Sequence, residues 1–558
     1  MNELLQRLAA RRGIVAEILA ASFIINLLGF TSTIYVMQVM NRYIGFGVDA
    51  TLMTLTVVAI IAVAFEAGFR EARTRLARLI VREPNRVLAE RTMETLLESR
   101  LAGLEKLPQS HRGEVMRGMD AVEQTYSATN LAALTDLPFA LLFLGALFLL
   151  HPALGMVAFL ASALQIAATL HNQMRLRDPT RQVADAQAEV NQSIAAAVGA
   201  ADTVRAFLGA EFVKQRWGRD REVLSGRRET VGGLQGLVMT LSGMIGGLQG
   251  VAIICLGGIL VVTGSLTAGA MIGANILAGR ALQPISRFAA MLESISKANQ
   301  AIRLAEDFGK LPRERREGTL PDRHAGHLEL IDLAFSFPGA PMPLFESLSL
   351  KLAPGEVLLV VGTNGAGKTT LARLLVGLLE PQRGQILVDG IDLRQIDTGW
   401  WRRRIAYLPQ EPSFLPGSIA DNFKAIDPSL DQRRMTEVIA AAGLKAFVDG
   451  QARGLDTPIV DGGRTLAVGV RRRLALARAL VNPSRLAILD EPTEGMDAEG
   501  TAALHKAVNA LAAGGATLIL FSHDPNAMKG ATFVLDLGVK PVPRLTAVAQ
   551  REKVPGDA

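Results

Sequence analysis

The residues best suited to chemistry form one short stretch, Gly362–Thr369, which reads Gly-Thr-Asn-Gly-Ala-Gly-Lys-Thr. It fits the pattern G-x-x-x-x-G-K-[ST], in which glycines allow backbone N–H groups to turn toward phosphates. Lys368 should reach the β- and γ-phosphates, and the Thr369 hydroxyl should bind Mg²⁺. The stretch therefore predicts binding of a nucleoside triphosphate. The predicted contacts are Gly362, Thr363, Asn364, Gly365, Ala366, Gly367, Lys368, Thr369 and Thr370.

Two flanking elements must position this loop. Residues 357–361 form an apolar run typical of a buried strand, and residues 370–376 have the apolar spacing of a helix. A phosphate loop requires a strand before it and a helix after it, because the helix start adds its positive dipole end. This context disfavours the alternative interpretation, a glycine-rich turn without a ligand.

Further candidates follow other predicted strands. The apolar run 486–490 ends in Asp490 and Glu491. Asp490 is expected beside Mg²⁺, and Glu491 where it could polarise the attacking water. The alternative for this pair is an acidic helix cap. Gln410 is a plausible contact to Mg²⁺ or water, and His523 follows a strand at the sheet edge where ligands bind.

The first half of the chain has the composition of a membrane protein. Hydrophobic residues make up 49% of the 558 residues, and mean hydropathy is +0.27. Six apolar stretches approach the roughly 20 residues that cross a bilayer. They cover residues 14–40, 52–69, 137–150, 153–170, 237–262 and 268–282. The net charge of +6 requires no nucleic-acid partner, and the single cysteine excludes an internal disulfide.

Lysine and arginine predict the orientation of these spans. Residues 70–117 carry eleven of them and residues 175–228 carry ten, whereas the three short loops between the other span ends carry only Arg42. The positive-inside rule places both termini and the two long loops in the cytoplasm. Helical periodicity over residues 87–97 predicts that the membrane helices continue beyond the bilayer.

Several polar residues lie within or near the spans, and each could line a transport path. Hydrogen bonding between helices is the favoured interpretation. These residues are Asn26, Gln38, Glu66, Asp136, Gln165, Gln249 and Asn275.

The changes in composition predict four regions. A transmembrane domain with long helical extensions covers residues 1–306, and a charged, proline-containing linker covers 307–326. A nucleotide-binding domain covers 327–545, and a loose tail covers 546–558.

The order of the phosphate loop, Gln410, Asp490-Glu491-Pro-Thr and His523 resembles an ATP-binding-cassette (ABC) ATPase. With six spans ahead of the cassette, the chain resembles an ABC exporter half-transporter. The implied fold is a membrane α-helical bundle fused to an α/β P-loop domain. Four segments are also similar to the permease/ATPase of type I protein secretion, namely residues 35–39, 136–152, 269–284 and 407–422.

The resemblance implies further roles, with ATP and Mg²⁺ as cofactors. Phe337 lies where an aromatic side chain stacks on adenine in this family. Gln410 would couple the Mg²⁺ site to the membrane helices, and Asp497 would communicate across a dimer of cassettes. His523 would hold the γ-phosphate and Glu491 in register.

One segment departs from the family pattern. A partner cassette normally closes over ATP with a Leu-Ser-Gly-Gly-Gln signature at a helix N-terminus, and the aligned residues here read Leu-Ala-Val-Gly-Val at 466–470. Ala467 lacks the hydroxyl that would donate to the γ-phosphate, a bond worth about 1.5–3 kcal/mol. Val468 and Val470 add β-branched bulk. The N–H of Gly469 and the helix dipole could still help, so ATP sandwiching should be weakened but not abolished.

This asymmetry leaves two assemblies open. A heterodimer would combine the intact ATP-binding residues of this chain with an intact signature from a different chain, whereas a homodimer would carry the defect twice. The three arginines at 471–473 follow the altered signature, and a solvated helix face is predicted for them.

The resemblance implies ATP-driven export of a polypeptide across the inner membrane of a Gram-negative cell. A periplasmic adaptor and an outer-membrane tunnel protein would be its partners, and Glu491 would be the general base. One alternative is export of a lipid or small molecule. Another is a slow or non-hydrolysing regulatory subunit that ATP switches, although the presence of Glu491 argues against it.

Overall fold

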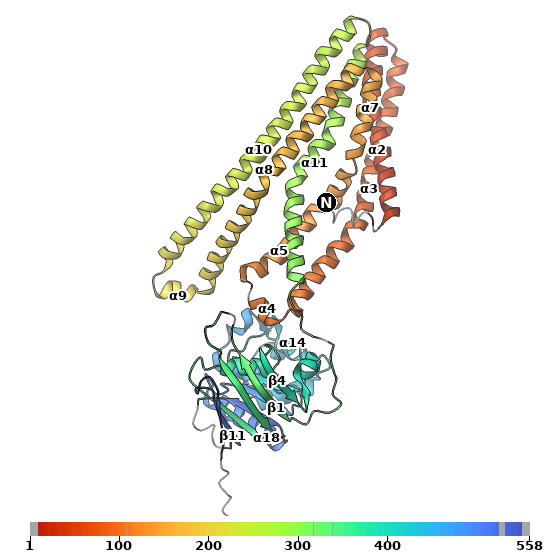
Figure 1. The fold of residues 1–558 in the computed structure, drawn as a ribbon. Helices are drawn as coiled ribbons and strands as arrows, with labels where there is room; N and C mark the ends of the chain where they lie inside the picture. Colours follow the sequence, from red (N-terminus) through yellow and green to blue (C-terminus); the bar gives the residue numbers. More distant parts are fainter. Residues whose placement is uncertain are drawn as a thin grey trace, which may run out of the picture. The chain divides into compact units, whose positions relative to one another are not determined.

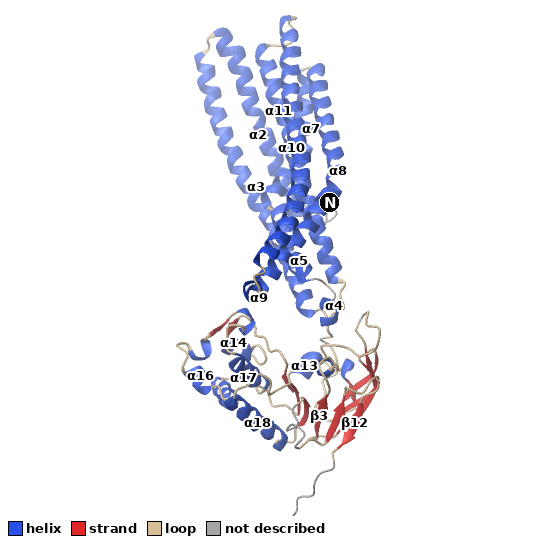
Figure 2. Cartoon of the chain, turned by 90° about the vertical axis from the view of Figure 1, so that its left-hand side faces the viewer, coloured by secondary structure: helices blue, strands red, loops and turns tan. Residues whose placement is uncertain are grey.

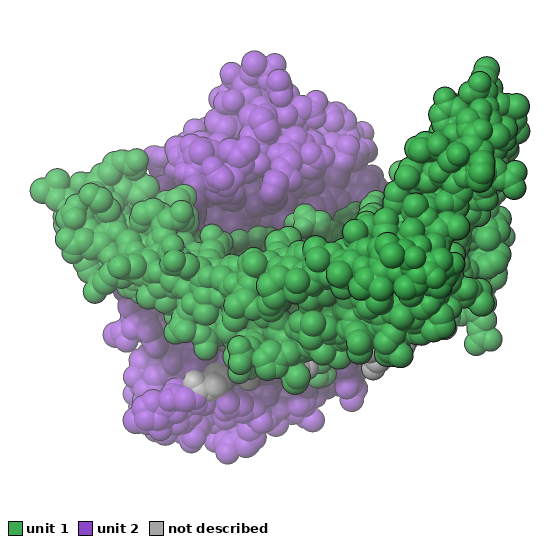
Figure 3. All heavy atoms as spheres, turned by 90° about the horizontal axis from the view of Figure 1, so that it is seen from above, with its two compact units in different colours: residues 1–98, 105–311 green, residues 99–104, 312–558 purple. Residues whose placement is uncertain are grey.

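The computed structural model describes residues 9, 11–105, 107, 109–315, 317–337, 339–523 and 530–548. The chain divides into two compact units (Figure 3). Unit 1 comprises residues 1–98 and 105–311, and unit 2 comprises residues 99–104 and 312–558.

Unit 1 is built from helices, several of them very long (Figure 1). In chain order they are α2 (Arg12–Gln38), the π-helix η1 (Val39–Ile44), α3 (Asp49–Glu98), α5 (Gln109–Thr125), α6 (Ala128–Leu134), the 3-10 helix η2 (Leu137–Phe139), α7 (Ala140–Leu150), α8 (Pro152–Gly199), α9 (Ala201–Ala206), α10 (Ala210–Val262) and α11 (Ala268–Gly309). The short helix α4 (Leu101–Glu105) lies at the boundary between the units.

The predicted helical extensions are present. Helices α3, α8 and α10 contain 50, 48 and 53 residues. At about 1.5 Å per residue each is over 70 Å long, more than twice the roughly 30 Å of a bilayer core. Within the described residues, five segments are apolar enough to cross a membrane, and they contain the first five predicted spans. The sixth predicted span forms the start of α11, which is not among those five.

Three of the polar residues predicted in or near the spans bond between helices, whereas the buried amide of Gln249 has no hydrogen-bond partner among the described residues. Asn26 Nδ2 donates to Asp136 Oδ1 at 3.3 Å, and Arg73 also contacts that buried carboxylate. Gln165 Nε2 donates to the Ser242 hydroxyl across α8 and α10 at 2.6 Å. These bonds fit the helix-packing interpretation, since an unpaired polar group is costly inside a membrane.

Unit 2 combines strands and helices (Figure 2), and its described residues form three sheets. The four-stranded antiparallel sheet has the order β2-β1-β4-β5, with strands β1 (Leu328–Phe335), β2 (Phe345–Leu352), β4 (Arg383–Val388) and β5 (Ile391–Asp392). The six-stranded sheet has the order β12-β11-β3-β10-β9-β6, with strands β3 (Val357–Val361), β6 (Ile405–Leu408), β9 (Leu486–Asp490), β10 (Thr517–Phe521), β11 (Phe533–Asp536) and β12 (Arg544–Ala547). A two-stranded sheet pairs β7 (Gly417–Ser418) with β8 (Pro458–Ile459).

The helices of unit 2 are α12 (Lys368–Leu375), α13 (Thr398–Arg402), α14 (Ile419–Lys424), α15 (Gln432–Ala441), α16 (Lys445–Asp449), α17 (Val468–Ala479) and α18 (Ala498–Ala513). Buried apolar side chains form three clusters among the described residues of the unit, and the largest includes residues of α12 and of strands β1 to β4. Strands β3, β9 and β10 are largely hydrophobic and mostly buried, apart from Asp490 at the end of β9 and Thr517 at the start of β10, as expected for parallel strands covered on both faces.

The parallel part of the larger sheet determines where the site forms. Strands β3, β10, β9 and β6 are neighbours and run parallel. Their carboxyl ends therefore meet at one edge, where ligands bind in sheets of this kind. The phosphate loop follows β3, Gln410 follows β6, Asp490 ends β9, and His523 follows β10. The two apolar runs predicted as strands, residues 357–361 and 486–490, have the bounds of β3 and β9.

Two predicted boundaries differ from the structure. The sequence predicts that the linker begins at residue 307, but helix α11 continues through residues 307–309, because its helical hydrogen bonding extends to Gly309. Strand β12 includes residues 546–547 of the predicted tail, because they pair with β11. The rest of that tail, residues 549–558, lies outside the described residues.

Residues 99–104 interrupt the predicted membrane domain and group with unit 2. The backbone N–H of Arg100 donates to the Pro312 carbonyl at 2.8 Å, and its guanidinium lies 2.5 Å from the Glu380 carboxylate. The predicted linker is also held to the cassette, where Glu314 accepts two hydrogen bonds from Arg402 at 2.7 and 3.0 Å. Contacts between residues so distant in the chain leave no local sequence pattern.

Candidate nucleotide-binding site

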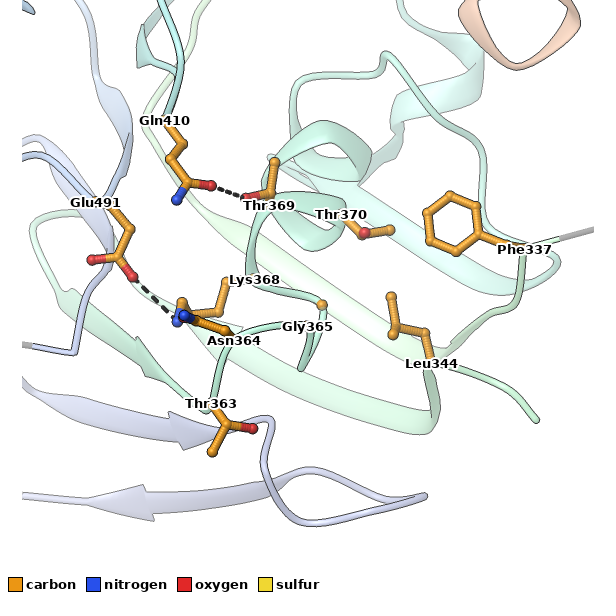
Figure 4. Close-up of a pocket in the computed structure, with 11 residues that line it drawn as sticks. Phe337, Leu344, Thr363, Asn364, Gly365, Lys368, Thr369, Thr370, Gln410 and Glu491 are labelled. Atoms are coloured by element: carbon orange, nitrogen blue, oxygen red, sulfur yellow. Dashed lines mark hydrogen bonds and ion pairs between the residues drawn. The ribbon is translucent and has the colours of Figure 1, made fainter. Parts of the chain in front are cut away.

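A cavity of about 350 Å³ opens where the phosphate loop meets the ends of the parallel strands (Figure 4). Eleven residues line it, from the loop itself and from three other segments of the cassette. They are Phe337, Leu344, Thr363, Asn364, Gly365, Gly367, Lys368, Thr369, Thr370, Gln410 and Glu491. All except Leu344 are among the site residues predicted from the sequence.

Glycine is required at two positions of the loop. Gly365 and Gly367 have φ values of +82° and +109°, which side chains other than glycine rarely adopt. A Cβ on Gly367 would also lie 2.7 Å from the Leu344 side chain. Gly367 immediately precedes α12, so the left-handed turn delivers the chain into a helix whose first N–H groups face the cavity.

Lys368 and Glu491 face each other at the base of the cavity. Lys368 Nζ donates to the Gly362 carbonyl at 2.8 Å and lies 3.2 Å from Glu491 Oε1 (Figure 4). The second carboxylate oxygen of Glu491 shares a hydrogen bond with His523 Nδ1 at 2.9 Å. Glu491 is buried and has a positive φ of +45°. The structure thus brings together three residues that are far apart in the sequence.

The predicted metal ligands also converge. Thr369 Oγ1 donates to Gln410 Oε1 at 3.1 Å. Asp490 is fully buried, and within the described residues neither of its carboxylate oxygens has a hydrogen-bond partner. Burial raises the pKa of Asp490 above its ordinary value, because the charged form loses its hydration. An unpaired buried carboxylate beside a hydroxyl and an amide oxygen fits a hard divalent cation such as Mg²⁺.

Phe337 lies at the opposite end of the cavity from Glu491 (Figure 4). It follows β1, its ring centroid is 5.1 Å from that of Phe335, and the two rings are perpendicular. The side chain is partly exposed, so one of its surfaces is available for stacking. The next residue, Pro338, lies outside the described residues. The cavity therefore has an aromatic end and a charged end.

The altered signature lies apart from this cavity. Helix α17 begins at Val468, directly after Ala467, and the Val468 side chain is half exposed. Gly469 packs against Asp497, since a Cβ on Gly469 would lie 3.7 Å from the Asp497 carboxyl carbon. Asp497 itself accepts a hydrogen bond from the Gly500 N–H at 2.8 Å and so caps α18. Among the described residues, neither Gly469 nor Asp497 lines the cavity of its own chain.

The prediction of a solvated face for the three arginines is wrong for Arg472 and Arg473, which are buried. Arg473 donates to the Gly443 carbonyl at 2.8 Å and lies 3.0 Å from Glu499. Arg472 donates to the Glu491 carbonyl at 2.9 Å. Their positions on α17 face the loop after β9, which no pattern in the signature segment revealed.

Sequence reasoning also missed Lys540. Its Nζ donates to the carbonyl oxygens of Ala366, at 2.8 Å, and Leu344. Burial lowers the pKa of Lys540, because the ammonium group loses hydration. This lysine lies between β11 and β12, far along the chain from the loop it contacts, so no motif spacing indicated it.

Comparison with known proteins agrees with this geometry. The family model described as ABC transporter matches residues 345–494, and the model described as ABC transporter transmembrane region matches residues 15–284. The type I secretion system ATP-binding protein PrsD of Rhizobium meliloti is 28% identical over 96% of this chain and 91% of its own length. The alpha-hemolysin translocation ATP-binding protein HlyB of Escherichia coli is 26% identical over 94% of this chain and 74% of its own length.

A solved structure has the same fold. It is that of a bacterial Atm1-family ABC exporter with ATP bound, with a TM-score of 0.82 and 17% sequence identity. The match covers 97% of this chain and 96% of that one. Both the helical unit and the cassette therefore belong to a known exporter architecture.

Proposed function

This chain belongs to the ABC transporter family, as an ATP-binding half-transporter with ATPase activity, and we propose that it exports a polypeptide as the permease/ATPase of a type I secretion system. The observation that carries the proposal is a cavity lined by the phosphate loop, Gln410 and Glu491, on a chain that is similar along nearly its whole length to type I secretion ATP-binding proteins. Two such proteins are similar over nearly the whole of this chain.

In the proposed ATPase site, each side chain has a role that follows from its position in the cavity. Phe337 stacks on adenine, and residues 362–370 bind the phosphates through backbone N–H groups and Lys368. Glu491 accepts a proton from the attacking water, and His523 holds its carboxylate in place. Thr369, Gln410 and Asp490 would hold Mg²⁺, which when bound neutralises charge on the phosphates.

The site requires a second half-transporter. ABC half-transporters dimerise, and Gly469 and Asp497 lie outside this chain's own cavity. We propose that the α17 N-terminus of one chain closes over the ATP of the other, with Asp497 communicating between the two sites. Because Ala467 cannot donate a side-chain hydrogen bond, a heterodimer with one fully competent site remains an alternative to a homodimer.

The proposed topology has both termini and the ATP-binding domain in the cytoplasm, as the distribution of lysine and arginine predicts. Closure of two cassettes on ATP would move the long helices α3, α8 and α10, and hydrolysis would reset them. A periplasmic adaptor and an outer-membrane tunnel protein would complete the export path, as the likeness to type I secretion proteins suggests.

The test compares culture supernatants of a strain that lacks this chain with those of the same strain complemented by wild-type or Glu491→Gln protein. We expect a secreted polypeptide to disappear on deletion and to return only with the wild-type chain. Unchanged supernatants together with an altered lipid composition would instead favour lipid export. ATP turnover by the purified chain alone in lipid then separates a self-sufficient homodimer from a chain that needs a different partner.

A further inference from the structure

A series of polar contacts connects helix α17 with the candidate cation site in the same cassette. Gln410 Nε2 donates to Glu494 Oε2 at 3.4 Å, and Arg472 Nη2 donates to the same oxygen at 3.2 Å. Arg472 Nη1 donates to the carbonyl oxygen of Glu491 at 2.9 Å. The proposed mechanism assigns no role to Arg472 or Glu494, yet both contact residues that it uses.

The charge of Glu494 determines which way the Gln410 amide faces. An ionised carboxylate can only accept hydrogen bonds, so Gln410 must turn its NH₂ group toward Glu494. Its oxygen then faces Thr369, whose hydroxyl donates to it at 3.1 Å. Oxygen is the amide atom that a hard divalent cation binds. A residue that could also donate at position 494 would permit the reverse orientation, with nitrogen toward the cation.

Arg472 holds two parts of this arrangement at once. Its side chain is only 8% exposed, whereas that of Glu494 is 49% exposed. A buried guanidinium fixes the partly exposed carboxylate in one position. Its second bond restrains the main chain at Glu491, whose positive φ is a backbone conformation that residues other than glycine rarely adopt.

We infer that Glu494 and Arg472 are positioning residues of the ATPase site: Glu494 orients the Gln410 amide with its oxygen toward the divalent cation, and Arg472 fixes Glu494 and the Glu491 main chain. This inference rests on the proposed role of Gln410 as a cation ligand. The same helix offers a matched control, because Arg473 pairs with Glu499 at 3.0 Å and Glu499 does not line the cavity within the described residues.

The test measures ATP binding to the full chain in lipid, in a Glu491→Gln background that prevents turnover. Equilibrium dialysis with labelled ATP gives one Kd in EDTA and another with Mn²⁺ as the probe cation. The Kd in EDTA divided by the Kd in Mn²⁺ measures how much the cation strengthens ATP binding. The Glu494→Gln side chain has the same shape as glutamate, but its amide can donate a hydrogen bond as well as accept one. We expect it to reduce this ratio about 10-fold, as outer-shell substitutions at metal sites do, with the Kd in EDTA unchanged.

Arg472→Lys should reduce the same ratio, since one ammonium group cannot replace the two-armed contact to Glu494 and Glu491. Glu499→Gln, which makes the same chemical change beside the neighbouring arginine, should leave the ratio within about twofold of the parent. With Glu491 intact, Glu494→Gln should also raise the Mg²⁺ concentration for half-maximal turnover about 10-fold.

A Glu494→Gln ratio equal to that of Glu499→Gln would overturn the inference. This result is distinguishable from failure of the proposed function. A chain that exports nothing but shows the expected loss of Mn²⁺-dependent binding would refute the export proposal and leave the positioning role supported.

Discussion

Two helices of the cassette begin at glycine-containing segments, but within the described residues only one of them begins at the cavity of its own chain. Helix α12 starts at Lys368, next to the left-handed Gly367, and its first residues line a cavity with Phe337 and Glu491. Helix α17 starts at the exposed Val468, and within the described residues its first turn lines no such cavity. The α12 end carries predicted nucleotide contacts of its own cassette, whereas the proposed role of the α17 end is to act on the nucleotide of a second cassette.

This difference explains how the two ends tolerate change. The α12 end is constrained by contacts within one chain, such as those of Lys368 to Gly362 and Glu491. The α17 end has the altered residues Ala467 and Val468, and the Val468 side chain is half exposed. The interior face of α17, by contrast, is held by Arg472 and Arg473. We therefore expect a change at the first turn of α17 to affect turnover more than folding.

The largest effect should come from a substitution in the cavity at the α12 end, at the residue that faces Lys368. Glu491→Gln should lower kcat about 10²- to 10⁴-fold, because the general base is lost. ATP binding should remain, since the loop that binds the phosphates is untouched. Phosphate release by the purified chain in lipid measures this, with Glu499→Gln as a control for removing an acidic side chain. A kcat within a factor of ten of wild type would contradict the assigned role of Glu491.

The next largest effect should come from repairing the α17 end. The triple variant Ala467→Ser, Val468→Gly and Val470→Gln should raise turnover of the chain alone about 10- to 100-fold, because a hydrogen bond to a charged group is worth about 1.5–3 kcal/mol. The same assay measures it. Turnover that is already high in wild type and unchanged by the repair would show that the altered signature suffices and that a homodimer is competent.

A smaller effect is expected at the aromatic end of the cavity. Phe337→Ala should raise KM for ATP about 10-fold with little change in kcat, because stacking of a base on an aromatic ring is worth about 1–3 kcal/mol. Phe337→Tyr keeps the ring and should retain the wild-type KM. Steady-state kinetics over a range of ATP concentrations distinguishes the two. Equal KM values for all three proteins would place adenine elsewhere.

The smallest effect concerns stability without ligands. Burial raises the pKa of Asp490, so its contribution to stability is present at low pH and is lost as pH rises from the ordinary carboxyl pKa through the raised one. Asp490→Asn replaces the buried carboxyl with a group that does not ionise, so the variant does not lose stability as pH rises. It should raise the melting temperature of the cation-free chain by about 2 °C at neutral pH. The gain should shrink as pH is lowered. Asp449→Asn, at an exposed aspartate, should show neither effect.

Much of the site could be predicted because its residues are coded locally. The phosphate loop is continuous in the sequence, Asp490 ends one largely apolar strand of five residues, and His523 follows another. Parallel strands end at a common edge, so these positions converge once the strand order is correct. The long helices were likewise predictable, because a membrane requires about 20 consecutive apolar residues per span.

The sequence by itself determined the chemistry: a triphosphate loop, two carboxylates after a strand, and apolar spans that place the chain in a membrane. Only the tertiary structure decided which groups hold that chemistry in place. Arg472, Glu494 and Lys540 act on the site through contacts across the fold. The physical reason is that local spacing specifies a strand or a turn, whereas a side-chain contact between distant segments depends on how those segments pack.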